Sequence, residues 1–378
     1  MNRIKRLVAG TSAIALISVP TIVMAAPVGT AANTDITNTV TVNYQVGGVS
    51  QAQVQATDTF KVDRKVNVTV ATLDSQAVAV TPGQTSAVTK FSVTNNSNAT
   101  LDFTLVGSNQ NGGASNFNGA INDTFDPTNL RVFIDTNNNG VYDPGTDVQS
   151  TTIAGLASGD RVNVFILSDI VLSGGGFPAD NAVATVMLTA TAASGATAGT
   201  AITGVTGASA GSGGTAVTQD ATNTKNGMET VFSDASYLTF DAQFNGKHAA
   251  RSDYAVTAAR LAVNKYSRVV QGPAGQTGTL FALPGAVVEY CIVVANGSGG
   301  STATTVAVSD VVPATMTYVA NSVYLNGAFN GTNGCAATGG TAGSDGANYN
   351  AGTTTVSNTF ASIAASETRT LRFQATIR

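Results

Sequence analysis

Short runs of alternating apolar and polar residues are the feature that most restricts how this chain can fold. The run NTVTVNYQV (38–46) places Val40, Val42, Tyr44 and Val46 at every second position, with Asn, Thr and Gln between them. A period of two is that of a β-strand with one buried face. Similar runs at VNVTV (66–70), KFSV (90–93) and LDFTL (101–105) end at Gly, Pro, Asn or Asp clusters. We therefore predict short, half-buried strands joined by turns.

The composition favours the same fold class. The chain has 40 Gly, no Trp and only 11% charged residues, whereas helices would need more Leu, Glu, Lys and Arg. About 350 residues remain after the leader described next, which is more than one typical sandwich. We predict an all-β fold of about two domains.

The N-terminus has the features of a secretory signal peptide. Three cations in MNRIKR precede an apolar run from Leu7 to Val19, and small residues at Val23 and Ala25 mark a cleavage site. We expect residues 1–25 to be removed. A second long apolar run is absent from the sequence, so we expect no transmembrane segment in the mature chain. The expected location is secreted, either extracellular or at the cell surface, although an export signal alone does not distinguish these from the periplasm.

The mature chain is acidic. Without the three cations of the leader, 15 Lys and Arg stand against 22 Asp and Glu, a net charge of −7. This balance argues against nucleic acid or an anionic lipid surface as partner.

Two echoes within the sequence indicate a repeated domain. VTPGQTSAVTKFSVTNNSNAT (80–100) returns as ALPGAVVEYCIVVANGSGGSTAT (282–304), and LASGDRVNVFI (156–166) returns as IAASETRTLRF (363–373), in the same order. We infer two divergent Ig-like antiparallel β-sandwiches, at 26–200 and 255–378. The Gly/Ala/Ser/Thr-rich stretch between them, 201–254, is expected to be a flexible connector or a loose edge hairpin.

The C-terminal repeat resembles a known family over about 120 residues. Its segment from Leu283 to Gly327 carries a Pro-Gly turn, a strand ending in VAN (294–296), VAVSD (306–310), a Pro turn, and YVANSV (318–323) before Asn-Gly. This order is similar to that of the bacterial conserved-repeat surface domain, the eleventh family of domains of unknown function. The resemblance implies an Ig-like module of secreted or cell-surface proteins, structural or adhesive in role, and implies no reaction.

The two cysteines both fall in the second repeat. Cys291 lies in a predicted strand and Cys335 in a Gly-rich loop. An even count in an exported chain favours one intramolecular disulfide, which would stabilise the fold by roughly 3–4 kcal/mol. Two free thiols or a link between chains are the alternatives.

One stretch, DTNNNGVYDPGTD (135–147), concentrates oxygen ligands. Asp135, Asn137, Asn139, the Val141 carbonyl and Asp143 follow the spacing of a calcium loop, with Gly140 at the sharp turn. The residue at the closing position is Thr146, so Asp147 would have to close the shell. NNNG and DPG are also strong turn formers, and a hairpin loop without an ion is the alternative. We predict a weak Ca²⁺ site with an affinity of about 10⁻⁴–10⁻³ M.

Enzymatic readings find little support in the sequence. The single histidine, His248, is expected to be a solvated residue of a basic connector, and the chain has no Cys/His cluster for zinc. We therefore expect a non-enzymatic structural protein of the cell surface or extracellular matrix, with calcium-supported folding. Its partners would be other copies of itself, paired through sheet edges or the N-terminal segment 26–37, or cell-surface components. The alternative is an adhesin-type module that binds a glycan or a protein.

Overall fold

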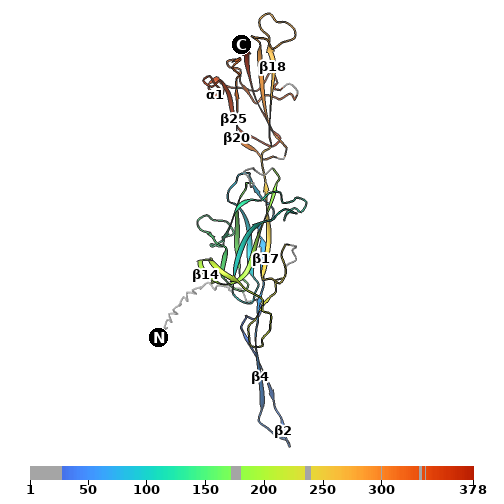
Figure 1. The fold of residues 1–378 in the computed structure, drawn as a ribbon, viewed down its shortest axis with the longest axis vertical. Coiled ribbons are helices and arrows are strands. Elements are labelled where there is room, and N and C mark those ends of the chain that lie inside the picture. Colours follow the sequence, from blue (N-terminus) through green and yellow to red (C-terminus); the bar gives the residue numbers. More distant parts are fainter. Residues whose placement is uncertain (1–27, 172–179, 235–239, 299, 332–333, 337) are drawn as a thin grey trace, which may run out of the picture.

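The structure is a computed structural model that describes residues 28–171, 180–234, 240–298, 300–331, 334–336 and 338–378. The expected signal peptide lies outside these residues. The described chain is almost entirely β-structure, and a single short helix interrupts it, so the predicted all-β class is confirmed. Figure 1 shows three parts along the long axis: a projecting hairpin, a larger sandwich and a smaller sandwich at the opposite end. No helix in the described part is long and apolar enough to cross a membrane.

The hairpin is formed by β1 (Asp35–Val42) and β4 (Val54–Lys61), and its tip by β2 (Gln45–Val46) and β3 (Val49–Ser50). β1 and β4 pair in unbroken antiparallel register, from Asp35 opposite Lys61 to Val42 opposite Val54. The expectation of a half-buried strand at 38–46 is wrong, because Val40, Val42, Tyr44 and Val46 are all exposed. The alternation predicted the strand correctly, but within the described residues no second layer covers its apolar face.

The first sandwich contains two large antiparallel sheets. One sheet has the order β11-β10-β13-β8-β6 and the other has the order β15-β12-β9-β14-β17-β7. Among the strands that the structure describes, only β7 on β17, and β16 on β5 in a separate pair, run parallel. The strand bounds are β5 (Arg64–Val66), β6 (Val68–Thr72), β7 (Val78–Val80), β8 (Ala87–Asn95), β9 (Leu101–Asn109), β10 (Thr128–Ile134), β11 (Val148–Gln149), β12 (Thr152–Leu156), β13 (Arg161–Asp169), β14 (Val183–Ala201), β15 (Ser209–Ala216), β16 (Thr230–Phe232) and β17 (Lys247–Val256).

In its described residues, the segment 201–254 belongs to the first sandwich rather than to a flexible connector, and its first part forms the edge hairpin that was the alternative, because β15 lies at the edge of the sheet and pairs antiparallel with β14. It supplies β15, β16 and most of β17, and β17 pairs with β14 along nine residues of register from Lys247 to Ala255. Small residues permit this placement. A Cβ added at Gly199 or Gly211 would come within 2.1 or 2.5 Å of a neighbouring carbonyl oxygen, so the close approach of β14 and β15 requires glycine. The low-complexity composition is therefore that of tightly paired strands rather than of a linker.

The second sandwich is smaller. One sheet has the order β18-β19-β26-β22-β23, with β21 also on β26, and the other has the order β20-β25-β24. The bounds are β18 (Leu261–Gln271), β19 (Val287–Asn296), β20 (Ala303–Val311), β21 (Met316–Tyr318), β22 (Tyr324–Leu325), β23 (Thr341–Ala342), α1 (Asp345–Asn348), β24 (Tyr349–Asn350), β25 (Thr355–Ile363) and β26 (Thr368–Ile377).

The strand pairings of the two sandwiches correspond in the places where the sequence repeats. β8 pairs with β13 and β9 with β12 in the first; β19 pairs with β26 and β20 with β25 in the second. The Pro-Gly turn that precedes each repeat is held in the same way. The N–H of Gly83 donates to the Ile170 carbonyl and that of Gly285 to the Ile377 carbonyl, both at 2.9 Å. The first sandwich thus contains the strand plan of the second, with additional strands.

Each sandwich has its own core. Phe91, Phe103 and Leu105 are fully buried in the core cluster of the first sandwich, and Phe360, Leu371 and Phe373 lie in the core cluster of the second. The cluster around the first core includes residues from β6, β8, β9, β12, β13, β14 and β17. Alternate residues of these strands point inward, so the valines at every second position form a core within each sandwich.

Candidate functional site

The predicted calcium loop connects two strands of the first sandwich. Asp135 directly follows β10 and Asp147 directly precedes β11. β10 and β11 pair antiparallel through Ile134 and Val148. The loop therefore lies where the sequence indicates, at the end of a hairpin on the edge of the five-stranded sheet.

Asp135 organises the first half of the loop. Its side chain is fully buried, and its Oδ2 accepts hydrogen bonds from the Gly140 N–H (2.7 Å) and from Asn163 Nδ2 (3.2 Å). Its Oδ1 accepts one from the Asn139 N–H (3.2 Å). Gly140 has a φ of +77°, a conformation that glycine adopts without strain. The carboxylate thus fixes the sharp turn that the spacing predicted.

The two asparagines and Asp143 meet on the exposed side of the loop. Asn137 Nδ2 and Asn139 Nδ2 both donate to Asp143 Oδ2, at 2.7 and 2.6 Å. These hydrogen bonds stabilise the charged form and lower the pKa of Asp143. An amide presents its nitrogen to a carboxylate but its oxygen to a cation, so cation binding would require both amides to turn. The Val141 side chain is exposed, and its N–H donates to Asn139 Oδ1 (2.8 Å).

Asp147, rather than Thr146, turns its carboxylate into the loop. Its two oxygens accept the N–H groups of Thr136 (3.2 Å) and Asp143 (2.7 Å). Burial raises the pKa of Asp147, and the nearby charges of Asp135 and Asp143 raise it further. Thr146 contributes its carbonyl, which accepts the Thr136 hydroxyl (2.8 Å). The three carboxylates therefore lie within electrostatic reach of one another.

The loop is closed by its own hydrogen bonds. Within the described residues, no group of three or more His, Cys, Asp or Glu has the arrangement of a metal site. The donor types suit a hard cation, which prefers carboxylate, amide and carbonyl oxygens. Calcium binding by Asp135, Asn137, Asn139, Val141, Asp143 and Asp147 stays a prediction.

The two cysteines form the predicted intramolecular disulfide. Cys291 of β19 and Cys335 are joined with their Cα atoms 5.5 Å apart, and both are buried. Tyr266 and Val293 pack against the bridge. The free-thiol and interchain alternatives are therefore set aside.

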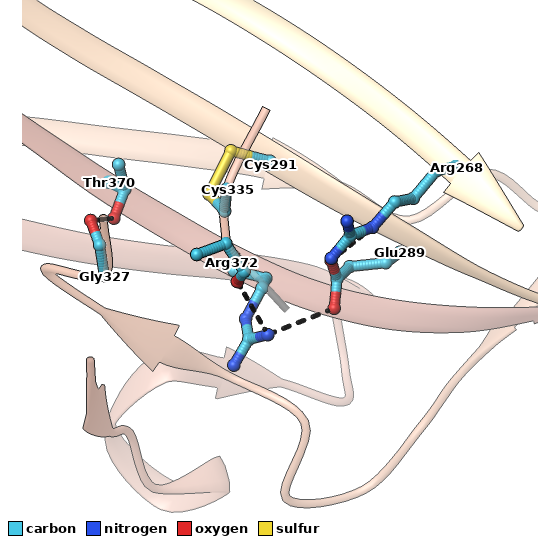
Figure 2. Close-up of a disulfide and its surroundings, with 8 residues drawn as sticks. Arg268, Glu289, Cys291, Gly327, Cys335, Thr370 and Arg372 are labelled. Carbon is cyan, nitrogen blue, oxygen red and sulfur yellow. Dashed lines mark hydrogen bonds and ion pairs between the residues drawn. A yellow bond between two sulfur atoms is a disulfide. The ribbon is translucent and has the colours of Figure 1, made fainter. Parts of the chain in front are cut away.

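A buried charged cluster lies beside this bridge. Figure 2 shows the disulfide next to Arg372, whose guanidinium group reaches towards Glu289. Glu289 accepts hydrogen bonds from Arg268 (2.5 and 3.0 Å) and lies 3.4 Å from Arg372. The cluster links β18, β19 and β26 across three neighbouring strands and compensates a buried carboxylate.

His248 is placed differently from the solvated residue that we expected. It lies in β17, and its Nδ1 accepts the N–H of Val70 in β6 (3.1 Å). The imidazole therefore bridges the two sheets of the first sandwich. Its nearest carboxylate atom, Asp241 Oδ2, is 4.0 Å away.

The sequence did not indicate that the hairpin of β1 and β4 projects from the surface. An alternating strand has the same sequence pattern whether or not a second layer covers it. The alternation at 38–46 therefore does not indicate that its apolar face is exposed. The threonines are a different signal that does point to a two-stranded hairpin. Thr37 of β1 pairs with Thr59 of β4, and Thr39 pairs with Thr57.

Comparison with known proteins adds no family to these observations. No family model matches the chain, and no curated protein matches it. The resemblance to the conserved-repeat surface domain therefore stays an expectation that rests on the motifs of residues 283–327.

Proposed function

We propose that this chain is an exported structural protein of the cell surface or extracellular matrix that assembles with other copies of itself through sheet edges. The observation that carries the proposal is the uncovered apolar face of the hairpin. An isolated two-stranded hairpin is only marginally stable in water, and apolar ribbons of this kind gain stability by packing against a partner.

The two faces of the hairpin differ sharply. Ile36 opposite Phe60, Val40 opposite Ala56 and Val42 opposite Val54 share one face, and threonines occupy most of the other. The outer edges of β1 and β4 have no strand partner among the described residues. An unpaired edge beside an apolar face favours pairing with another chain.

Calcium-supported folding is part of the proposal. The loop from Asp135 to Asp147 combines three carboxylates with amide and carbonyl oxygens, and a cation would offset their mutual repulsion. An exported protein meets millimolar calcium more often than a cytosolic one does, and its disulfide suits the same surroundings.

We propose no reaction for the chain. Its single histidine is engaged between the sheets, and the carboxylates of the candidate loop accept backbone N–H groups. The adhesin-type alternative would place a glycan or protein ligand on exposed loops.

The assembly of the mature chain tests the proposal. The protein from residue 26 onward would be purified with its disulfide intact and studied by light scattering and electron microscopy with and without millimolar calcium. We expect filaments or linear oligomers at micromolar concentration. A strictly monomeric protein that binds a component of a glycan or surface-protein array would favour the adhesin alternative instead.

A further inference from the structure

The second sandwich lacks two strands that complete the first. In the first sandwich, β9 pairs on one side with β12 and on the other with β14, which in turn pairs with β17. In the second sandwich, β20 occupies the position of β9 and pairs with β25, but its other side has no strand partner among the described residues. The missing unit is a pair of antiparallel strands.

This difference uncovers core positions of the opposite sheet. β14 and β17 lie against β6 in the first sandwich, where Val68 and Val70 are 0% and 2% exposed. The register places Val68 and Val70 opposite Asn95 and Val93, just as Leu261 and Val263 of β18 lie opposite Asn296 and Val294.

Leu261 and Val263 are nevertheless 44% and 63% exposed. Cross-strand partners share a face of the sheet, and Val294 belongs to the core of the second sandwich. Val263 therefore points to the core side and yet is largely exposed among the described residues.

The open edge itself shows the same incomplete burial. Val306 and Val308 of β20 are half-buried, whereas the corresponding Phe103 and Leu105 of β9 are fully buried. Lys265 of β18 and Asp310 of β20 form an ion pair at 2.7 Å across the open side. The second sandwich thus has an open edge with uncovered apolar residues, Leu261, Val263, Val306 and Val308, at the position that β14 and β17 fill in the first.

The hairpin has the dimensions and the pattern of the missing unit. β14 pairs with β9 over eight residues, from Val186 to Ala193, and β1 and β4 have eight residues each. β14 and β17 present mostly apolar residues to the core, with two polar residues among them, Ser252 opposite Val186 and His248 opposite Ala190. The apolar face of the hairpin contains one polar pair, Asn38 opposite Asp58.

The hairpin lies too far away to cover the open edge of its own chain. It projects from one end of the molecule, and the second sandwich lies at the other end with the first sandwich between them (Figure 1). A joint between the hairpin and the open edge therefore links two copies.

Charge favours the same arrangement. Residues 26–259 have nine Lys and Arg against eighteen Asp and Glu, a net charge of −9, whereas residues 260–378 have six against four, a net charge of +2. The N-terminal part of one copy is thus attracted to the C-terminal part of another.

We propose that the β1/β4 hairpin of one copy packs on the open edge of the next copy, where one of its strands pairs with β20 and its apolar face covers Leu261 and Val263. This inference rests on the proposed function and specifies its joint. The contact is heterologous, so it repeats head to tail and produces an open chain rather than a closed dimer.

Two variants remove the two halves of the joint separately. Val40→Asp with Val42→Asp places charges on the exposed apolar face of the hairpin, and Thr39→Asp with Thr41→Asp is the control on the opposite face. Ala307→Pro blocks the edge of β20, with Ala307→Ser as its control.

The proline is placed where it leaves the second sandwich intact. Val312 donates its N–H to the Thr354 carbonyl (2.8 Å), and alternate residues of an antiparallel strand direct their N–H groups to the same neighbour. The N–H of Ala307 therefore points to the open side, where proline is tolerated in an edge strand.

Light scattering on the full mature chain gives the readout. We expect each blocked variant to be monomeric alone and an equimolar mixture of the two to form a dimer, because one retains the open edge and the other retains the hairpin. The control variants should assemble like the unmodified protein. Dimer formation also demonstrates that both blocked variants are folded.

The outcomes separate the joint from the wider proposal. If the unmodified protein assembles but either blocked variant does so equally well, or their mixture stays monomeric, the joint is wrong while self-assembly stands. If the unmodified protein stays monomeric at all concentrations, the proposed function fails and the joint fails with it.

Discussion

Asn95 and Asn296 make the same hydrogen bonds in the two sandwiches. Each ends a central strand, and each donates its side-chain amide to the carbonyl at the end of a strand in the opposite sheet: Leu156 (2.8 Å) for Asn95 and Ile363 (3.0 Å) for Asn296. The N–H of each also donates to the carbonyl of the acidic corner residue, Asp160 or Glu367. Both side chains are almost fully buried, so each amide satisfies carbonyls that water does not reach.

Replacement of either asparagine should destabilise its own sandwich. Asn95→Ala and Asn296→Ala each leave a buried carbonyl without a donor, which costs about 1–3 kcal/mol. Calorimetry should show one of two unfolding transitions shifted down in each variant, a different one for each. Asn96→Ala is the control, because Asn96 is half-buried and its side-chain amide donates to the hydroxyl of Thr69 (2.8 Å) rather than to a buried carbonyl. Equal effects of all three changes would contradict the shared role.

Removal of the disulfide should weaken the second sandwich alone. The bridge closes a separation of 44 residues, for which the chain-entropy model gives about 3–4 kcal/mol. Cys291→Ala with Cys335→Ala should lower the unfolding temperature of the C-terminal sandwich and leave the other transition in place. Reduction of the unmodified protein should reproduce the shift. An unchanged transition under both treatments would mean that the bridge contributes little.

Calcium should stabilise the first sandwich. With an affinity of about 10⁻⁴–10⁻³ M, 10 mM Ca²⁺ adds about 1.4–2.7 kcal/mol to the free energy of unfolding. Asp147→Asn should abolish the calcium-dependent rise of the unfolding temperature, and Thr146→Ala should keep it, because Asp147 turns its carboxylate into the loop. A melt that is identical in calcium and in chelator would leave the loop as a hairpin turn without an ion.

Stability should fall at alkaline pH through Tyr254. Burial raises the pKa of this phenol from 10.0 to about 12, and its hydroxyl donates to the Ala87 carbonyl (2.9 Å). The stabilisation is complete below pH 10 and is lost as the pH rises through 12, because the unfolded chain releases its proton first. The rise of the Tyr254 pKa from 10.0 to about 12 corresponds to roughly 3 kcal/mol in the free energy of unfolding.

Denaturant unfolding at several pH values tests whether stability falls between pH 10 and 12. Tyr254→Phe should cost about 1 kcal/mol at neutral pH, and its stability should decline less between pH 10 and 12 than that of the unmodified protein. The comparison between the two proteins is needed because burial also raises the pKa of Tyr318, in the second sandwich, to about 12. If the free energy of unfolding declined equally with pH in both proteins, Tyr254 would not be the source of the alkaline loss of stability.

The candidate site was partly predictable. The position of the loop between two strands and the turn at Gly140 follow from spacing and turn preference, which act within a few residues. The choice of Asp147 over Thr146 depends on which side chain is turned inward, and neighbouring strands decide that. The bridging role of His248 had no local signal, because its partner Val70 lies 178 residues away in the chain.

Local chemistry thus determined a great deal: the strands from alternation, the two repeats from their shared turns, and the disulfide from cysteine count. Tertiary structure decided which alternating strands are covered. Residues 201–254 look like a linker but complete the first sandwich, whereas residues 35–61 look half-buried but project into solvent. The physical reason is that periodicity records only which face of a strand is apolar. Whether a sheet of the same chain, or one of another copy, covers that face depends on contacts between residues far apart in sequence.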